Sequence, residues 1–129
     1  MRKLFFLFSA LLWTVIVLFL CLTKANNLPV ISIANLDKYI HAFFHFVFTL
    51  LWILFFRTQI NNANRFKPLF VSFMLSVFFG VLIEFLQQQL TTTRSADKFD
   101  VLANIAGATI ATFLVLFYDK VKSSNTNNK

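Results

Sequence analysis

Four long apolar stretches divide this chain, and short polar segments separate them. The stretches are Leu4–Leu22, Ile40–Phe56, Leu69–Leu86 and Val101–Tyr118. A helix needs about 20 apolar residues, with a range of about 17–25, to cross the hydrocarbon core of a bilayer, and each stretch reaches that range. Strands of a membrane barrel would instead alternate apolar and polar residues. The pattern therefore predicts an all-α integral membrane protein with four transmembrane helices joined by short loops.

The composition supports this prediction. The chain has 129 residues, which suits a single domain, and 58% of them are hydrophobic. Only 13% are charged, about half of the ~25% that is usual in soluble domains. The net charge is +7, but the basic residues lie at the ends of apolar stretches and form no patch, so we expect no nucleic-acid partner. Cys21 is the single cysteine, which excludes an intrachain disulfide and a cysteine-built zinc site.

Basic residues predict how the chain crosses the membrane. Lysine and arginine are enriched in cytoplasmic loops. The two termini and the second loop carry Arg2, Lys3, Arg57, Arg65, Lys67, Lys120, Lys122 and Lys129, whereas the first and third loops carry Lys24, Lys38, Arg94 and Lys98. We therefore expect both termini to lie in the cytoplasm, with the first and third loops on the outer side.

The ends of the predicted helices carry further signals. Arg2 and Lys3 precede the first stretch as in a signal peptide, but cleaved signals have apolar segments of only about 7–15 residues, so we expect an uncleaved membrane helix. Pro68 suits the first turn of the third helix, and Asp97 is placed to cap the fourth. The polar, low-complexity residues 122–129 predict a disordered tail.

Polar side chains within the helices gather near their outer ends. Ionisable groups in membrane spans usually face a bundle interior or a water-filled cavity. Residues spaced by four share one face of a helix. The sequence therefore predicts one outward-facing polar site, whose candidate residues are Asp37 and His41 on the second helix, Glu84 and Gln87 on the third, Arg94 in the third loop, and Asp100 and Asn104 on the fourth. Arg94 is the natural anion contact, because a guanidinium pairs with phosphate or carboxylate through two bonds.

Each candidate also has a simpler interpretation. Asp37 and Asp100 could complement the positive N-terminal ends of their helices. His41 and His45 could be interfacial histidines bonded to backbone or water. Glu84 is harder to explain in this way, because the C-terminal end of a helix disfavours an acid, so it needs a partner or a proton.

Small residues in the fourth helix recur every four positions, at Ala103, Gly107 and Ala111. Such a repeat lets another helix approach closely in a membrane. We interpret it as a packing seam rather than as part of a site.

Three segments together resemble the VanZ-like family of small membrane proteins. They are "DKYIH" at Asp37–His41, "GVLIEFLQ" at Gly80–Gln87 and "RSADKFDVLANIAG" at Arg94–Gly107. The similar region covers about residues 35–112, within a single domain over 1–129. The chain departs from the family pattern at Ala111, where many members carry a second glycine.

The resemblance implies a multi-pass protein of the bacterial inner membrane, in contact with membrane lipids. The family's namesake is associated with resistance to the lipoglycopeptide teicoplanin. The resemblance therefore implies a site for a lipid head group, a lipid-linked cell-wall precursor or a lipoglycopeptide. We expect no cofactor. The chain could form oligomers.

Two other function classes remain as alternatives. An intramembrane enzyme could use Glu84 and His41 for acid–base chemistry, although no serine or cysteine nucleophile stands near them in the sequence, so we favour binding over catalysis. We expect no metal, but His41 and His45 at i, i+4 form half of a metal site that Glu84 or Asp37 could complete. A structural or assembly subunit would use the same polar groups only to join helices.

Overall fold

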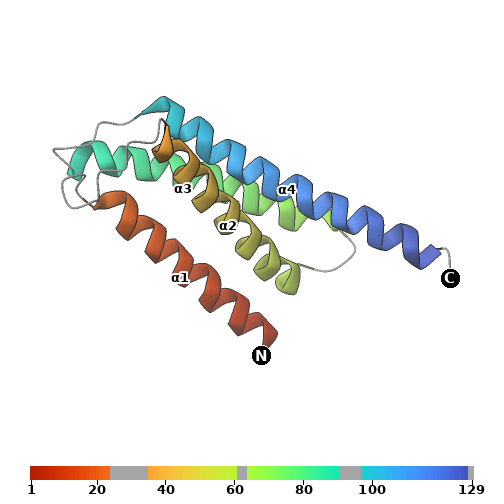
Figure 1. Ribbon diagram of the computed structural model, residues 1–129. Helices are drawn as coiled ribbons and strands as arrows, with labels where there is room; N and C mark the ends of the chain where they lie inside the picture. The colour runs from red at the N-terminus through yellow and green to blue at the C-terminus, as the bar shows by residue number, and fades with distance from the viewer. Residues whose placement is uncertain (24–34, 61–63, 91–96, 128–129) are drawn as a thin grey trace.

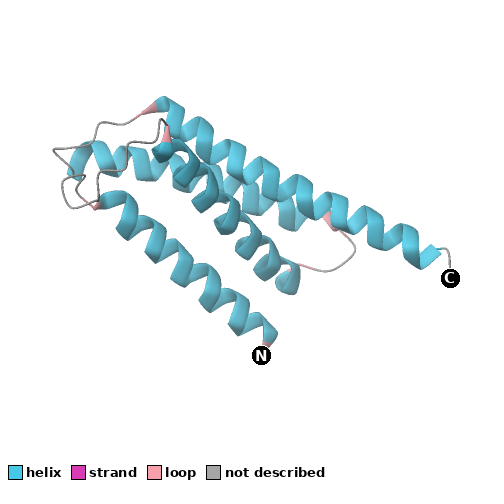
Figure 2. Cartoon of the chain, viewed as in Figure 1, coloured by secondary structure: helices cyan, strands magenta, loops and turns pink. Residues whose placement is uncertain are grey.

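The computed structural model describes residues 1–23, 35–60, 64–90 and 97–127, and these residues form helices without strands (Figures 1 and 2). The helices are α1 (Arg2–Leu22), α2 (Leu36–Gln59), α3 (Phe66–Leu90) and α4 (Lys98–Asn127). Each contains one of the four predicted apolar stretches, and each is long and apolar enough to cross a membrane. The prediction of an all-α protein with four candidate spans is therefore confirmed.

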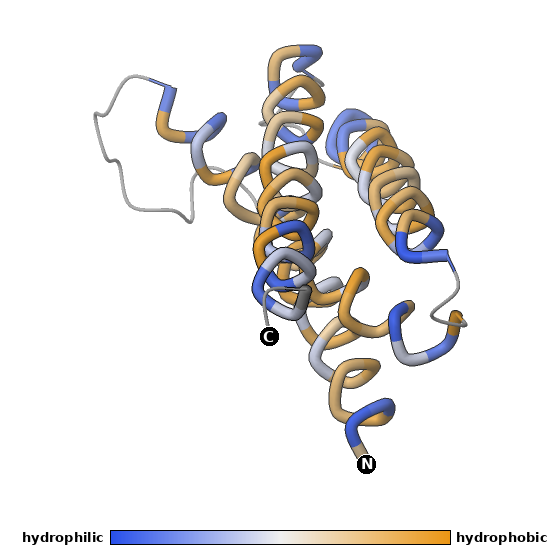
Figure 3. The backbone as a smooth tube through the Cα atoms, turned by 90° about the vertical axis from the view of Figure 1, so that its right-hand side faces the viewer, coloured by the Kyte–Doolittle hydropathy of each residue, from blue (hydrophilic) through white to orange (hydrophobic). Residues whose placement is uncertain are grey.

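The helices form an up-and-down bundle. The C-terminal ends of α1 and α3 and the N-terminal ends of α2 and α4 meet at one end of the molecule, on the left in Figure 1. We call this end, marked by Leu36, Leu90 and Lys98, the polar end. Both chain termini lie at the other end, so the chain crosses the bundle four times. Figure 3 shows hydrophobic residues along the helices and hydrophilic ones mainly at their ends.

The surface of the bundle is apolar and parts of its interior are polar. Large side chains such as Phe19, Phe70, Phe113 and Phe117 are each at least 66% exposed. Exposing this much apolar area to water would be costly, at roughly 25 cal/mol for each Å². The surface therefore suits lipid, and the helices fit a multi-pass membrane protein.

Helices α2 and α4 approach each other closely. A Cβ atom added to Gly107 would lie 2.0 Å from the carbonyl oxygen of Ala42. Ala103 and Ala111, one turn to either side, are buried. The predicted seam is therefore a packing surface, and its partner is α2. Close contact without bulky side chains is the usual way for membrane helices to associate.

The remaining helices close the core. Phe48 of α2 and Phe79 of α3 stack with ring centroids 4.8 Å apart, and Val17 and Cys21 of α1 pack in the same cluster. The indole of Trp13 donates a hydrogen bond to the backbone oxygen of Phe44 (3.0 Å), which ties α1 to α2. At the opposite end Ile53, Leu69 and Val115 form a second cluster between α2, α3 and α4.

The starts of α4 and α3 carry the two signals predicted for them, a cap at Asp97 and a proline in the first turn. Asp97 accepts a hydrogen bond from the backbone N–H of Phe99 (2.8 Å), as an N-cap does. Pro68 lies in the first turn of α3, where a missing N–H leaves no intrahelical bond unmade. Asn64 accepts hydrogen bonds from the N–H groups of Phe66 and Lys67 and starts that helix.

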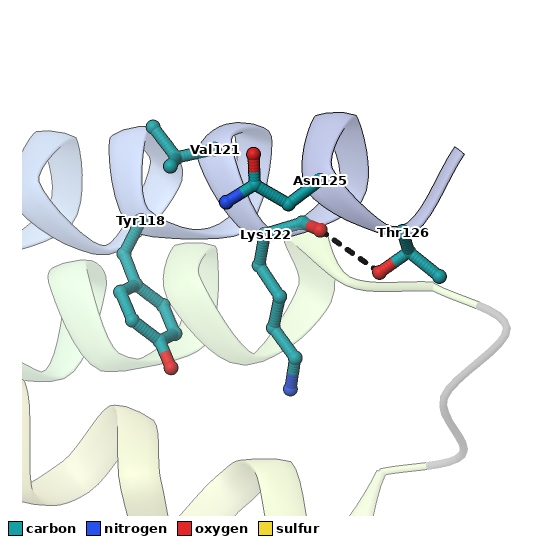
Figure 4. Close-up of a pocket in the computed structure, with 5 residues that line it drawn as sticks. All are labelled: Tyr118, Val121, Lys122, Asn125 and Thr126. Atoms are coloured by element: carbon teal, nitrogen blue, oxygen red, sulfur yellow. Dashed lines mark hydrogen bonds between the residues drawn. The ribbon is translucent and has the colours of Figure 1, made fainter. Parts of the chain in front are cut away.

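The prediction of a disordered tail over residues 122–129 is wrong for most of its length. Helix α4 continues to Asn127, and residues 128–129 lie outside the described range. Adding residues to an existing helix avoids the cost of nucleating a new one. Polar residues that follow an apolar helix can therefore continue it. Thr126 donates to the backbone oxygen of Lys122 (3.0 Å, Figure 4), and the Arg57–Asp119 ion pair fastens α4 to the end of α2.

Candidate functional site

Three helices contribute buried polar side chains to one place at the polar end. These are His41 from α2, Glu84 from α3, and Asp100 and Asn104 from α4, which we call the polar cluster. Each is at most 8% exposed. Membrane spans rarely bury polar groups in this way unless the groups serve a shared interior network or a function. Four of the seven predicted site residues therefore meet, although they lie up to 63 positions apart in the chain.

His41 is the centre of the polar cluster. Its Nδ1–H donates to Asn104 Oδ1 over 3.1 Å. The same nitrogen lies 3.9 Å from Glu84 Oε1, and Nε2 lies 3.8 Å from Asp100 Oδ2. Because Nδ1 donates to Asn104, a neutral His41 carries its lone pair on Nε2, facing Asp100. The expected approach of His41 to Glu84 is observed, at a distance longer than a direct hydrogen bond.

Several polar atoms of this cluster have no hydrogen-bond partner among the described residues. They are Glu84 Oε1, Asp100 Oδ1 and Asn104 Nδ2. The other oxygen of Glu84 accepts a hydrogen bond from the backbone N–H of Asp97 (3.1 Å). Leaving a buried polar atom unsatisfied costs about 1–3 kcal/mol, so these atoms are candidates for contacts with water or a ligand.

Lys38 covers the polar cluster on the solvent side. Its Nζ lies 3.2 Å from Asp37, 3.3 Å from Asp97 and 3.5 Å from Asp100. The backbone N–H of Phe99, together with Lys38, holds the pKa of Asp97 below its usual value. The sequence analysis did not identify Lys38 as a site residue. Its spacing could have indicated it, because Lys38 lies three residues before His41 and so shares one face of α2 with it.

Two other predicted site residues lie beside the cluster rather than within it. Asp37 is about half exposed and pairs with Lys38 at its edge. Gln87 is buried and donates from Nε2 to the backbone oxygen of Cys21 (2.8 Å), which joins α3 to the end of α1. Arg94 lies outside the described residues, so its expected role stays a prediction.

His45 lies one turn deeper than His41 and has different neighbours. Its Nδ1 lies 2.8 Å from the hydroxyl oxygen of Ser76, and its ring packs against Phe48 and Phe79. The structure thus brings a serine to a histidine, which the sequence pattern did not suggest. Both side chains are at most 1% exposed and lie deeper in the bundle than the polar cluster. We therefore interpret this pair as a buried contact between α2 and α3.

Gly80 makes room for Asn104. A Cβ at Gly80 would lie 2.8 Å from Asn104 Nδ2 and 3.2 Å from His45 Cε1. Gly80 stands one helical turn before Glu84, so the same face of α3 supplies both a gap for Asn104 and a carboxylate. The spacing of glycine and glutamate in "GVLIEFLQ" therefore has a structural reason.

Among the described residues of the polar end, acidic groups outnumber basic ones. Asp37, Glu84, Asp97 and Asp100 compare with two lysines, Lys38 and Lys98, and with the imidazole of His41. This excess suits a cation or an amine inside the cluster. The same excess disfavours a ligand that carries only negative charge, because Lys38 already pairs with Asp37, Asp97 and Asp100.

Two sets of side chains could offer ligand atoms to a metal ion, His41 with Glu84 and Asp100, and Asp37 with Asp97 and Asp100. In the second set Lys38 Nζ lies within 3.5 Å of all three carboxylates, so its ammonium group occupies the position that a metal ion would take. His45 belongs to neither set. Among the described residues, the potential metal partners of His41 are therefore acidic residues of α3 and α4.

Two hollows lined by described residues lie away from the polar cluster. One is lined by residues of α4 alone, from Tyr118 to Thr126 (Figure 4), at the end opposite the polar cluster. Another runs between α3 and α4 and is lined mainly by phenylalanine and leucine, including Phe70 and Phe113. In a bilayer such an apolar groove is filled by lipid chains.

Comparison with known proteins gives one relative. No family model matches the chain, and no solved structure matches it. An uncharacterized protein of the fission yeast Schizosaccharomyces pombe is 33% identical over 92 residues, which covers 71% of this chain and 54% of the relative. The chain thus spans about half the length of the curated relative that it matches. That relative is fungal and lends no support to a bacterial origin, and the VanZ-like resemblance stays a prediction.

Proposed function

We propose that the chain is a VanZ-like multi-pass membrane protein whose polar cluster binds the head group of a membrane lipid. One observation carries the proposal: four buried polar side chains from three helices meet at one end of a bundle whose outer surface is apolar. A site at helix ends lies at the depth where lipid head groups lie. A lipid can also reach it from the side, through the bilayer.

The proposed orientation places the polar end on the outer side of the membrane. It rests on the excess of lysine and arginine beside the two termini and in the second loop. Both termini lie at the same end of the bundle, as this orientation requires. The head group would then belong to the outer leaflet of the bacterial inner membrane, or of the corresponding membrane in another organism.

The charges of the site favour a head group that carries both a phosphate and a primary amine. The neighbouring carboxylates of Glu84 and Asp100 can accept hydrogen bonds from an ammonium group. Lys38 at the edge can contact the phosphate, and Arg94 is a second anion contact in the proposal. Aminophospholipids occur in bacteria and fungi alike, which fits the fungal relative.

A lipid-linked cell-wall precursor or a lipoglycopeptide is a second occupant of the same site, by resemblance to the family. Both would present polar groups at the outer surface while their lipid parts lie in the bilayer. Resistance to glycopeptides would then follow from capture of the drug or of its target. Altered drug sensitivity of an Asp100→Asn strain, without altered lipid binding, would favour this occupant.

Catalysis is a candidate function because His41 stands between two carboxyl groups. Its nitrogens lie 3.9 Å from Glu84 and 3.8 Å from Asp100, close enough for proton transfer through one water. Acid–base chemistry on a lipid-borne ester or phosphate would follow. An assembly role is the remaining alternative, in which the cluster only joins helices.

The head-group proposal is tested by lipid binding. The full chain in detergent is mixed with phosphatidylethanolamine or phosphatidylglycerol and analysed by native mass spectrometry. We expect a preference for phosphatidylethanolamine of about tenfold, or about 1.4 kcal/mol. Asp100→Asn should abolish this preference, whereas Asp119→Asn, at the opposite end of α4, should keep it. Equal binding of both lipids, or an unchanged preference in Asp100→Asn, would refute the proposal.

A further inference from the structure

We propose that His41, Glu84 and Asp100 bind one divalent transition-metal ion, and that Asn104 positions the imidazole. One ligand atom from each of the three side chains lies within 4.8 Å of the other two. All three residues are at most 8% exposed, which separates them from the exposed acidic groups that are common on proteins. The proposal stands on this geometry and does not depend on the head group.

The bonding of His41 is that of a metal ligand. Metal-binding histidines usually donate their second ring N–H to a carbonyl or carboxylate, which fixes the tautomer. His41 Nδ1–H donates to Asn104 Oδ1 (3.1 Å) in this way. The lone pair of Nε2 then faces Asp100 Oδ2 at 3.8 Å. Asn104 is in turn held by the gap at Gly80.

The carboxylates are also set up for a cation. Glu84 Oε1 is buried and has no hydrogen-bond partner among the described residues, and the buried Asp100 Oδ1 has the ammonium of Lys38 at 3.5 Å but no hydrogen bond. Ligands about 2.0–2.1 Å from a zinc ion lie roughly 3.3–3.5 Å from one another. His41 Nε2 lies 3.8 Å from Asp100 Oδ2, which exceeds this by only a few tenths of an ångström. Glu84 lies nearer to Nδ1, so its side chain would have to rotate toward Nε2 to complete the site.

Charge balance gives a second reason. Two carboxyl groups buried beside one imidazole would repel each other when both are ionised. A divalent cation between Glu84 and Asp100 neutralises both, and it removes the cost of their mutual repulsion. Lys38 also contacts Asp100, but at 3.5 Å and from the outer side, where it pairs with Asp37 and Asp97.

The ligand chemistry selects among metals. One imidazole nitrogen with two carboxylate oxygens suits Zn²⁺ or Mn²⁺, whereas Mg²⁺ and Ca²⁺ prefer oxygen ligands alone. Zn²⁺ binds such sites more tightly than Mn²⁺ in the general order of affinities. Three protein ligands also leave a coordination position open for water or a phosphate oxygen.

Metal analysis tests the proposal without any assay of activity. The full chain is purified with a tag that contains no histidine, and its metals are measured by mass spectrometry. We expect about one zinc ion per chain. Asp100→Asn and Glu84→Gln, which keep side-chain size, should lose it, and Asp119→Asn should keep it. Asn104→Ala should weaken zinc affinity by about 10–100-fold, as for other groups that orient a ligand.

Unmodified protein provides a second measurement, in case the variants fold poorly. Chelation should lower its melting temperature in detergent, and Zn²⁺ should restore it, while Mg²⁺ should not. Absence of bound zinc together with no stabilisation by added Zn²⁺ or Mn²⁺ would overturn the proposal. Phosphatidylethanolamine binding is measured on zinc-free protein, because an ammonium group and a zinc ion would compete for Glu84 and Asp100. Bound zinc without a lipid preference supports the metal proposal alone, and a lipid preference without bound zinc supports the head-group proposal alone.

Discussion

Gly107 of α4 lies against the backbone of Ala42 in α2 so closely that a methyl group has no space. A Cβ there would stand 2.0 Å from the carbonyl oxygen and 2.8 Å from the carbonyl carbon of Ala42. The contact lies next to His41 and one turn from Asn104, so it sets the distance between the two helices where the polar cluster forms. The glycine is therefore a structural condition of the site.

Substitution of Gly107 by alanine should separate α2 from α4. Backbone atoms cannot rotate away, so we expect a loss of stability at or above the usual range of about 1–3 kcal/mol for overpacking. Thermal unfolding in detergent measures it. Ala106→Val on the exposed face of the same helix is the control and should change stability little. An unchanged melting temperature in Gly107→Ala would contradict the observed approach.

Gly80→Ala should behave differently, because its new methyl group would meet side-chain atoms. Asn104 Nδ2 and His45 Cε1 would lie 2.8 and 3.2 Å away, and both can shift. We expect a smaller loss of stability than for Gly107→Ala but a clear loss of zinc and lipid binding, because Asn104 orients His41. Binding that survives in Gly80→Ala would argue against this role of Asn104.

Lys38 and Lys98 are neighbouring cations at the polar end with opposite expected importance. Lys38 bridges three carboxylates, whereas Lys98 is exposed and lies over the ring of Phe99. Lys38→Gln should reduce phosphatidylethanolamine binding by about tenfold. The variant loses the proposed phosphate contact, and it leaves the carboxylate of Asp100 without the positive charge of Lys38. Lys98→Gln should change binding less than about twofold, as exposed charges contribute little. The reverse ranking would place the site elsewhere.

The sequence predicted the four helices, the depth of the candidate site and the approach of His41 to Glu84, but not the other contacts. Continuous apolar stretches fix the helices, and the positions of Glu84 and Asp100 along them fix the depth. The pairing of Lys38 with Asp97 and Asp100 depends on how the starts of α2 and α4 meet, which no spacing within one helix reveals. The bond from Gln87 to the end of α1 depends on tertiary packing in the same way.

The pH dependence of stability should show the cap of α4. The N–H of Phe99 and the charge of Lys38 hold the pKa of Asp97 below its usual value of 3.8. Asp97 therefore stabilises the fold above about pH 4, and this contribution is lost as the pH falls through the lower pKa of the folded state. Asp97→Asn keeps a capping oxygen that cannot titrate. Melting temperature between pH 5 and 3 should fall less steeply in Asp97→Asn than in the unmodified chain.

The proposed orientation can be tested by labelling two ends of one helix. In a Cys21→Ser background, Lys98→Cys and Lys122→Cys place single thiols at the start and near the end of α4. A maleimide that cannot cross membranes should modify Lys98→Cys in intact cells, and Lys122→Cys only after permeabilisation. The opposite result would put the polar end in the cytoplasm. It would also remove the outer leaflet as the source of the head group.

The last prediction separates the two histidines of α2. His45 is bonded to Ser76 and packed between aromatic rings, whereas His41 meets Glu84, Asp100 and Asn104. His45→Phe should lower stability by about 1–3 kcal/mol, since it leaves the hydroxyl of Ser76 without this partner, but it should keep zinc and lipid binding.

Adding Ser76→Ala should recover part of the stability that His45→Phe loses, because both polar partners are then removed. His41→Gln should lose both zinc binding and lipid binding. It should unfold at nearly the same temperature as the unmodified chain without zinc. Melting temperature and bound zinc are measured on the same preparations. If His45→Phe loses zinc and His41→Gln keeps it, the ion lies one turn deeper than proposed, and the polar cluster is a helix-packing network.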